Sequence, residues 1–338
     1  MKKLEISDII GILEREEFQK LGSFISSPYF GISKRAASLY CYISDNYESA
    51  AKGMLTRDAA AKAVLGDTYS DDNARKLFSD LNKAIEDFLT AEVFAKETPL
   101  KQLMLLKALR NKEDRGRHSQ KMRELTKQLG AMEPDALSYR LIADAAEEEF
   151  TAEDPAEFHE YSEALQNWCS MLDAYYMSSK LLIYEYMFSK QMLNKSGKLY
   201  NWSMADEIFS YIEANAAAVK NDNPDIYLKY LMVKMIREKN DSLMPEYSEF
   251  LRENEKRFSR ANVTSYYSDL YNYATIHISR GRHDLRGPFL NLIKEIEPRG
   301  LLFDAGEDKI HIYTFKQIAD TAFHLKETAW AGEFIERY

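Results

Sequence analysis

The sequence contains little glycine, little proline and almost no cysteine. Of its 338 residues, 13 are Gly and 8 are Pro, about half the share that these two residues usually have. Because sheet-rich folds need many tight turns, this scarcity favours long helices. The two cysteines, Cys41 and Cys169, are far apart in apolar helical contexts. This spacing excludes a disulfide framework and a CxxC zinc site.

Long hydrophobic runs are also lacking. The first ten residues, MKKLEISDII, do not contain the apolar core of a signal peptide. No stretch approaches the ~18 consecutive apolar residues of a membrane span. We therefore expect a cytoplasmic protein without a membrane partner. The hydrophobic fraction of 45%, the charged fraction of 29% and the net charge of −9 are typical of a folded globular chain.

Motifs that carry chemistry are missing as well. The sequence has no GxGxxG after a strand, no GxxxxGK[ST], no HExxH and no GxSxG. Its six histidines include no i,i+4 pair that could bind a metal. We interpret His277 and His283, on either side of Gly281, as surface residues of a repeat. The sequence thus predicts a protein that is not an enzyme and has no catalytic residue, metal or cofactor.

Helix-start signals, in contrast, are frequent. Ser33, Thr56 and Ser70 each precede a segment with helical apolar spacing, and Ser203 with Asp206 resembles a capping box. Three further starts place a capping side chain before proline, at Thr98-Pro99, Asp154-Pro155 and Asn223-Pro224. No segment alternates with period two. The sequence predicts an all-α protein of roughly eleven or twelve helices.

The stretch SSPYFGISKR, residues 26–35, predicts a corner between two helices. Pro28 disfavours helical geometry in the residue before it, and Gly31 can adopt a positive φ. Tyr29 and Phe30 then lie at the corner. We expect both rings to fill the gap between the helix ends.

Two adjacent segments differ sharply in charge. Residues 101–127 contain nine Lys or Arg and three Asp or Glu, whereas residues 128–163 contain eleven acidic residues and only Arg140 as a base. We expect these two runs to attract each other within the fold. The ETP sequence at 97–99 marks the expected boundary between an N-terminal helical domain, 1–95, and a helical-hairpin domain, 96–338.

The C-terminal third contains a repeat. Ala274, Gly281 and Pro298 occupy the small, turn and terminal-proline positions of a 34-residue helix–turn–helix unit. The next repeat places apolar or small residues at corresponding positions, namely Ile318, Ala319, Ala322 and Ala331. Arg286 and Lys326 depart from the pattern. This part resembles the tetratricopeptide-repeat family in a degenerate form, most clearly over 224–338. The resemblance implies an α-solenoid of stacked hairpins.

The resemblance also implies an inner groove lined by the first helix of each hairpin. Counting back from the turns at Asn240, Gly281 and Lys326 gives the expected partner-binding residues Tyr227, Tyr230, Lys234, Arg237, Tyr271, Thr275, Lys316, Asp320 and Phe323. We expect their polar tips to face solvent on one concave surface. Tyrosine offers a large contact area, and Lys or Arg can bind a carboxylate.

These features favour a non-catalytic interaction or scaffold protein that binds an unknown protein or peptide. One alternative is a nucleic-acid-associated regulator that uses the basic segment 101–127, although the isoelectric point of about 5.4 argues against nucleic acid. Another is an α-helical hydrolase, which would require two distant carboxylates to meet, one of them in an apolar pocket. The sequence does not identify the partner or the oligomeric state.

Overall fold

The computed structural model describes residues 6–153, 160–193, 197–302 and 310–338. Over these residues every regular element is a helix, and no strand occurs. The prediction of an all-α protein is therefore confirmed. The chain divides into two compact units, Met1–Gln102 and Leu103–Tyr338.

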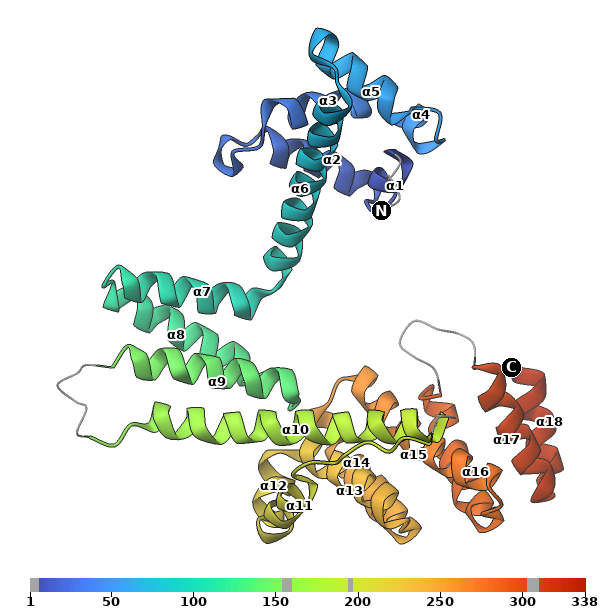
Figure 1. The fold of residues 1–338 in the computed structure, drawn as a ribbon. Coiled ribbons are helices and arrows are strands. Elements are labelled where there is room, and N and C mark those ends of the chain that lie inside the picture. The colour runs from blue at the N-terminus through green and yellow to red at the C-terminus, as the bar shows by residue number, and fades with distance from the viewer. Residues whose placement is uncertain (1–5, 154–159, 194–196, 303–309) are drawn as a thin grey trace. The chain divides into compact units, whose positions relative to one another are not determined.

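The N-terminal unit is built around one long helix. Its helices are α1 (Ile6–Ile10), α2 (Arg15–Ser26), α3 (Lys34–Asp45), α4 (Tyr47–Ala51), α5 (Arg57–Leu65) and α6 (Asp71–Lys96). Helices α2, α3 and α5 pack against α6, and α1 contacts α4 (Figure 1). The core between them is apolar and includes Leu21, Leu39, Phe78 and Leu81. Its members recur at the 3-4 spacing that places side chains on one helix face.

The predicted helix starts in this unit are confirmed by their hydrogen bonds. The side chain of Ser33 accepts a hydrogen bond from the backbone N–H of Ala36 at 3.2 Å. Thr56 and Ser70 cap α5 and α6 in the same way. Each cap satisfies one of the backbone donors that the first turn of a helix leaves without a partner.

The corner at residues 27–31 has the predicted backbone but not the predicted packing. Helix α2 ends at Ser26, a 3-10 turn spans Pro28–Phe30, and Gly31 has φ +62°. Phe30 stacks on Phe24 with 4.0 Å between ring centroids. Tyr29, however, is 88% exposed, so our expectation that it fills the gap is wrong. Successive residues of a 3-10 turn point about 120° apart, and only one of the two rings can face the helix.

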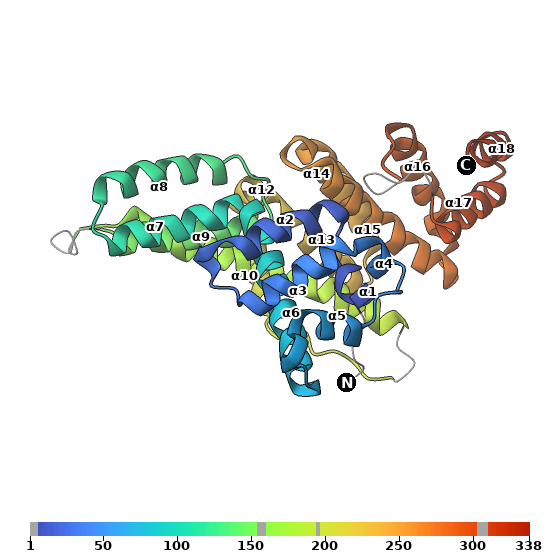
Figure 2. The same ribbon diagram turned by 90° about the horizontal axis from the view of Figure 1, so that it is seen from above.

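The C-terminal unit contains the remaining helices, and α7 crosses the division between the units. They are α7 (Thr98–Asn111), α8 (Arg115–Leu129), α9 (Ala136–Thr151), α10 (Glu163–Leu193), α11 (Ala205–Ala214), α12 (Ala216–Asp222), α13 (Pro224–Glu238), α14 (Met244–Asn254), α15 (Arg260–Ser279), α16 (Arg286–Ile296), α17 (Ile312–His324) and α18 (Thr328–Arg337). From α13 to α18 each helix contacts the next one along the chain. Figure 2 shows these six helices following one another along the unit.

Four helix starts that we predicted from Thr98 onward have different outcomes. Helix α13 begins at Pro224, as expected, although Asn223 before it forms no side-chain cap, and α7 begins at Thr98 itself, the residue that we expected to cap it. The capping box at Ser203 is wrong, because α11 is preceded by Met204 in a left-handed conformation with φ +66° and no side-chain cap. The start at Asp154-Pro155 lies outside the described residues.

The long helix α10 organises this unit. It packs along α9 and also against α13 (Figure 1). Between these helices lies a buried polar network centred on Asp225. Its carboxylate accepts hydrogen bonds from the hydroxyl of Tyr139 and, at 2.8 Å, from that of Ser178. The Lys229 ammonium lies 3.1 Å from the same carboxylate and 2.8 Å from the Ser178 hydroxyl. The network therefore joins α9, α10 and α13.

The basic and acidic runs meet at one buried point. Glu148 of α9 accepts hydrogen bonds from the guanidinium of Arg110 at 2.8 Å and 3.2 Å, and lies 3.2 Å from the ring of His118. This bidentate bond raises the pKa of Arg110. Two other cations of the basic run pair locally, Arg117 with Asp114 and Lys121 with Glu124. The expected attraction thus acts through Glu148.

Three hairpin turns share a left-handed residue. Lys239 follows α13 with φ +53°, Gly281 follows α15 with φ +95°, and Lys326 follows α17 with φ +61°. Glycine adopts this conformation without a steric cost, and lysine does not. From α13 to α17 this conformation recurs after every second helix. None of the described helices is long and apolar enough to cross a membrane.

Candidate functional site

The nine expected groove residues differ in their exposure. Tyr227, Tyr230 and Tyr271 are buried, so these rings contribute to packing rather than to a solvent-facing surface. Lys234 and Thr275 are partly buried, and Arg237 is exposed. Lys316, Asp320 and Phe323, all on α17, are exposed.

The members on α13 are held by acidic side chains of neighbouring helices. The Tyr230 hydroxyl and the Lys234 ammonium both donate to Glu213 of α11, at 2.7 Å and 2.5 Å. The hydrogen bond from Lys234 is the main cause that lowers the pKa of the Glu213 carboxyl. The Tyr227 hydroxyl donates to Glu246 of α14 at 2.6 Å. These side chains are thus engaged within the unit.

One of the nine, Arg237, lines a pocket of about 380 Å³. The pocket lies between the end of α10, the segment before α11, and the ends of α13 and α15. It is lined by Phe188, Gln191, Leu199, Tyr200, Trp202, Ile236, Arg237, Lys239, His277 and Arg280. We call it the basic pocket. No acidic residue is among these ten, although the protein carries a net charge of −9.

Its aromatic wall is fixed by the chain that precedes α11. The Trp202 ring stacks on Tyr184 of α10, with 5.3 Å between centroids and 9° between planes. The Tyr184 hydroxyl donates to the backbone carbonyl of Ser203, and the Lys180 ammonium lies 3.1 Å from the Ser203 hydroxyl. These contacts hold Trp202 in a defined position beside the pocket.

Its cations come from the ends of two helices. Lys239 and Arg280 are the C-caps of α13 and α15, and within the described residues neither forms an ion pair. Arg237 donates to Asp206 at 2.6 Å and lies over the Phe209 ring. Cations at helix C-termini are favoured by the helix dipole. Two of the three positive charges are therefore available to a ligand.

His277 completes the pocket. Its ring packs on Tyr273 with centroids 4.4 Å apart, and its Nε2 atom is buried without a hydrogen-bond partner among the described residues. Burial lowers the pKa of His277, and the charges of Arg280 and Lys239 lower it further. The ring is consequently neutral at pH 7. A buried polar atom without a partner is costly unless a ligand or water supplies one.

The sequence reasoning identified Arg237 but missed most of this pocket. We interpreted His277 as a surface residue of a repeat, whereas its Nε2 atom is buried. Lys239 and Arg280 each lie directly beside a turn position from which we counted. Their recurrence as cations at the ends of first helices was the available signal. The sequence contained no comparable signal for Trp202, because the packing of this residue on α10 depends on the path of the chain between the helices.

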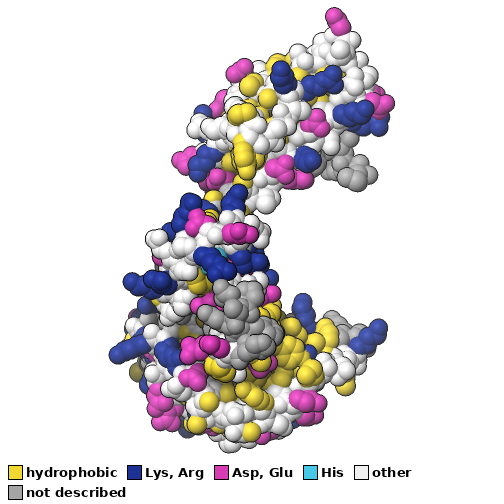
Figure 3. All heavy atoms as spheres, turned by 90° about the vertical axis from the view of Figure 1, so that its left-hand side faces the viewer, with side chains coloured by type: hydrophobic (Ala, Val, Ile, Leu, Met, Phe, Trp, Pro, Cys, Tyr) yellow, Lys and Arg dark blue, Asp and Glu magenta, His cyan; other side chains and the backbone are white. Residues whose placement is uncertain are grey.

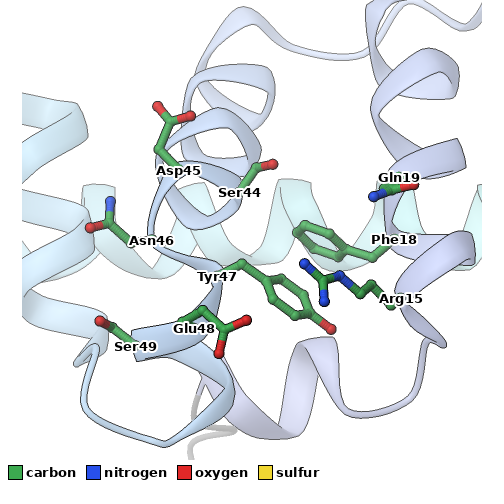
Figure 4. A pocket seen from close by; sticks show the side chains of 9 residues that line it. All are labelled: Arg15, Phe18, Gln19, Ser44, Asp45, Asn46, Tyr47, Glu48 and Ser49. Atoms are coloured by element: carbon green, nitrogen blue, oxygen red, sulfur yellow. The ribbon is translucent and has the colours of Figure 1, made fainter.

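A second pocket, of about 340 Å³, lies in the N-terminal unit between the start of α2 and the junction of α3 with α4 (Figure 4). The Arg15 guanidinium lies over the Tyr47 ring, 5.9 Å from its centroid. Asp45 and Glu48 also line this pocket. Because both basic and acidic side chains line this pocket, it favours neither an anionic nor a cationic ligand.

The features expected for the two alternative functions can also be located. Glu185 of α10 and Asp269 of α15 interact electrostatically, and burial raises the pKa of Glu185 and raises that of Asp269 to about 7. These two distant carboxylates interact electrostatically, but neither lines the two pockets described above. The basic segment lies on α7 and α8, and Figure 3 shows Lys and Arg side chains on this face of the C-terminal unit.

Among the side chains that the structure describes, no group of three or more His, Cys, Asp or Glu is placed to hold a metal ion. No protein-family model matches the chain, and neither a curated protein nor a solved structure matches it. The candidate site therefore depends on the geometry of the basic pocket.

Proposed function

We propose that the protein is a non-catalytic interaction protein, and that its basic pocket binds an acidic segment of a partner protein. The observation that carries this proposal is the composition of the pocket wall, which has three cations, one neutral histidine and no acid. A carboxylate can accept hydrogen bonds from Lys239 and Arg280 at the rim.

The aromatic wall adds a second requirement. Tyr200 and Trp202 offer flat apolar surfaces beside the cations. A segment that combines Glu or Asp with an aromatic side chain would use both parts of the pocket, because stacked rings contribute beyond their buried area. An orphan Nε2 atom of His277 further favours a ligand with a hydrogen-bonding group at its inner end.

The fold supports an interaction role in a second way. Helices α13 to α18 contact one another in sequence, and left-handed residues recur at Lys239, Gly281 and Lys326. Such an arrangement supports our proposal of stacked tetratricopeptide-like hairpins. Stacked hairpins present helix ends in a row, which suits the recognition of an extended segment.

The test measures binding of a fluorescent copolymer of glutamate and tyrosine by anisotropy. We expect saturable binding that weakens as salt rises, because rim charges are screened. The double variant Lys239→Glu/Arg280→Glu should reduce affinity at least ~10-fold. Lys239→Glu alone should also weaken binding, and Lys326→Glu is the matched control for this single variant, since it makes the same charge change at the equivalent turn of another hairpin.

Three outcomes would contradict the proposal. Wild-type affinity in the double variant would show that the pocket is not used. An equal loss in Lys326→Glu would show that only net charge matters. Binding of a labelled single-stranded DNA that depends on Lys239 and Arg280, without binding of the copolymer, would favour the nucleic-acid alternative.

A further inference from the structure

Helix α10 has an exposed apolar face that its contacts with α9 and α13 leave uncovered. Leu172 is 51% exposed and Tyr186 is 63% exposed. At 100° per residue the exposed apolar side chains of this helix fall on one stripe, which consists of Leu165, Leu172, Tyr176, Ile183 and Tyr186. The opposite face carries Leu181, Ser178 and Ala174, which are buried. We call the exposed set the α10 stripe.

The α10 stripe is long for a surface feature. It spans 22 residues of helix from Leu165 to Tyr186, or about 32 Å at a rise of 1.5 Å per residue. Figure 3 looks toward the end at which α10 begins and shows hydrophobic side chains on the surface of this unit. Contiguous apolar surface of this kind marks interaction sites in soluble proteins.

The charges of α10 indicate what covers the stripe. Apart from Glu185, which faces the interior, the helix carries Glu163 and Asp173 in its first half, and Lys180 and Lys190 in its second half. The outer pair, Glu163 with Lys190, and the inner pair, Asp173 with Lys180, are centred on the same point, between Tyr176 and Met177. Reversing the direction of the helix therefore leaves the spacing of these four charges unchanged and inverts their signs. The apolar stripe has nearly the same centre.

We propose that the α10 stripe binds the α10 stripe of a second copy of this chain in antiparallel orientation. A two-fold axis beside Tyr176 would place Asp173 of each copy opposite Lys180 of the other, whereas Glu163 lies on the same helix face as the buried Leu181 and does not enter the contact. A parallel pair would place like charges together, which is destabilising. An isologous contact of this kind closes on itself and yields a dimer. The inference does not rest on the proposed function, because the basic pocket lies on another side of α10.

The first test is the mass of the full chain in solution. The chain has a mass of 39.2 kDa, so we expect sedimentation velocity at micromolar concentration to show a species of twice that mass. Leu172→Glu/Ile183→Glu should weaken the dimer at least ~10-fold, because it places charge in the contact. Met54→Glu and Ile312→Glu, which alter exposed apolar residues elsewhere, should leave it unchanged.

The second test examines the orientation through charge reversal. Asp173→Lys should weaken the dimer, because each copy would then place a lysine opposite Lys180. Adding Lys180→Asp to the same chain should restore it, because the inverted pattern is again self-complementary when antiparallel. If Asp173 and Lys180 contributed only to folding, exchanging the two residues would not restore the dimer.

A third test locates the axis. In a Cys41→Ser/Cys169→Ser background, Tyr176→Cys should form a covalent dimer with a short bismaleimide, whereas Leu165→Cys should not. A monomer at all concentrations overturns the proposal, as does a dimer that tolerates Leu172→Glu/Ile183→Glu. Cross-linking through Leu165→Cys but not Tyr176→Cys would overturn the antiparallel arrangement.

Discussion

The N-terminal unit buries only apolar side chains, whereas the C-terminal unit also buries polar and charged ones. The nine buried polar or charged residues of the described chain all lie after Gln102, namely His118, Ser138, Glu148, Ser178, Asp225, Lys229, Thr264, Glu297 and Thr321. In the described part of the N-terminal unit the buried core residues are all Leu, Ile, Phe or Ala. The two units therefore reach a folded state by different physical means.

The difference teaches how each unit selects its helix partners. An apolar core specifies packing by shape alone and tolerates many hydrophobic replacements. A buried ion pair adds little net stability, but removing one partner is very costly. We infer that the network of Asp225, Ser178, Lys229 and Tyr139 fixes which helices of the C-terminal unit meet, and in which register.

The largest expected effect comes from breaking this network. Lys229→Met leaves the Asp225 carboxylate buried without its cation, and should lower the free energy of unfolding by about 3–5 kcal/mol. All three tryptophans of the chain, Trp168, Trp202 and Trp330, lie in the C-terminal unit. Urea unfolding followed by tryptophan fluorescence therefore reports this unit separately.

Two control variants sharpen the result. Lys229→Met/Asp225→Asn should recover most of the loss, because residue 225 then carries no unpaired charge. Leu39→Ala in the N-terminal unit should cost about 2–5 kcal/mol through its cavity and should leave the tryptophan transition unchanged, with the loss visible as faster hydrogen exchange in α3. A cost below about 1 kcal/mol for Lys229→Met would contradict a specifying role for the network.

The next effect is a pH dependence confined to the C-terminal unit. Burial raises the pKa of Asp269 to about 7, and its neighbour Glu185 also has a raised pKa. A carboxyl with a raised pKa binds a proton more tightly in the folded state than in the unfolded chain, so the stability of the unit should fall as pH rises from about 4 to about 7. Asp269→Asn should therefore stabilise the unit by about 1–3 kcal/mol at pH 8 and have no effect at pH 4.

The measurement is the urea midpoint of the tryptophan transition at several pH values. The N-terminal unit, with its apolar core, should show a much weaker dependence over the same window. A wild-type midpoint that rises between pH 4 and 7 would contradict the sign that we derive. Glu185→Gln is the companion variant and should act in the same direction.

The smallest expected effect concerns the corner of the N-terminal unit. Tyr29→Ala should change the unfolding free energy by less than about 0.5 kcal/mol, because the ring is 88% exposed. Phe30→Ala should cost about 1 kcal/mol, because it removes the stack on Phe24. Thermal melts of the two variants followed by circular dichroism distinguish the rings. Equal losses would mean that both rings pack in solution.

Local features were predictable from the sequence where the deciding interaction is short in range. The caps at Ser33, Thr56 and Ser70, and the positive φ of Gly31, depend on groups within three residues. The tetratricopeptide-like pattern likewise placed a turn at Lys326 although glycine is absent there. Such predictions need no knowledge of the remaining chain.

Features that depend on distant segments were not predictable. Tyr139 meets Asp225 across 86 positions of the sequence, and no periodicity relates them. The pocket wall at Trp202 depends on how the chain returns along α10. The burial of Tyr227, Tyr230 and Tyr271 depends on acidic neighbours and helices that the repeat pattern does not encode. The helix pattern thus predicted the elements, whereas the long-range pairings decide the site.

The hydrogen bond between Tyr139 and Asp225 has a consequence for the chain while it is being made. Helix α9 leaves the ribosome 86 residues before the carboxylate that its tyrosine needs. At about 5–20 residues per second, Tyr139 of α9 waits about 4–17 s for Asp225 of α13, and Ser178 of α10, 47 positions before Asp225, waits about 2–9 s. During that interval α9 can pack on α8 and α10, but the faces of α9 and α10 that surround Asp225 lack α13. A chaperone that binds nascent chains would therefore find its longest-lived target in the segment between α9 and α13.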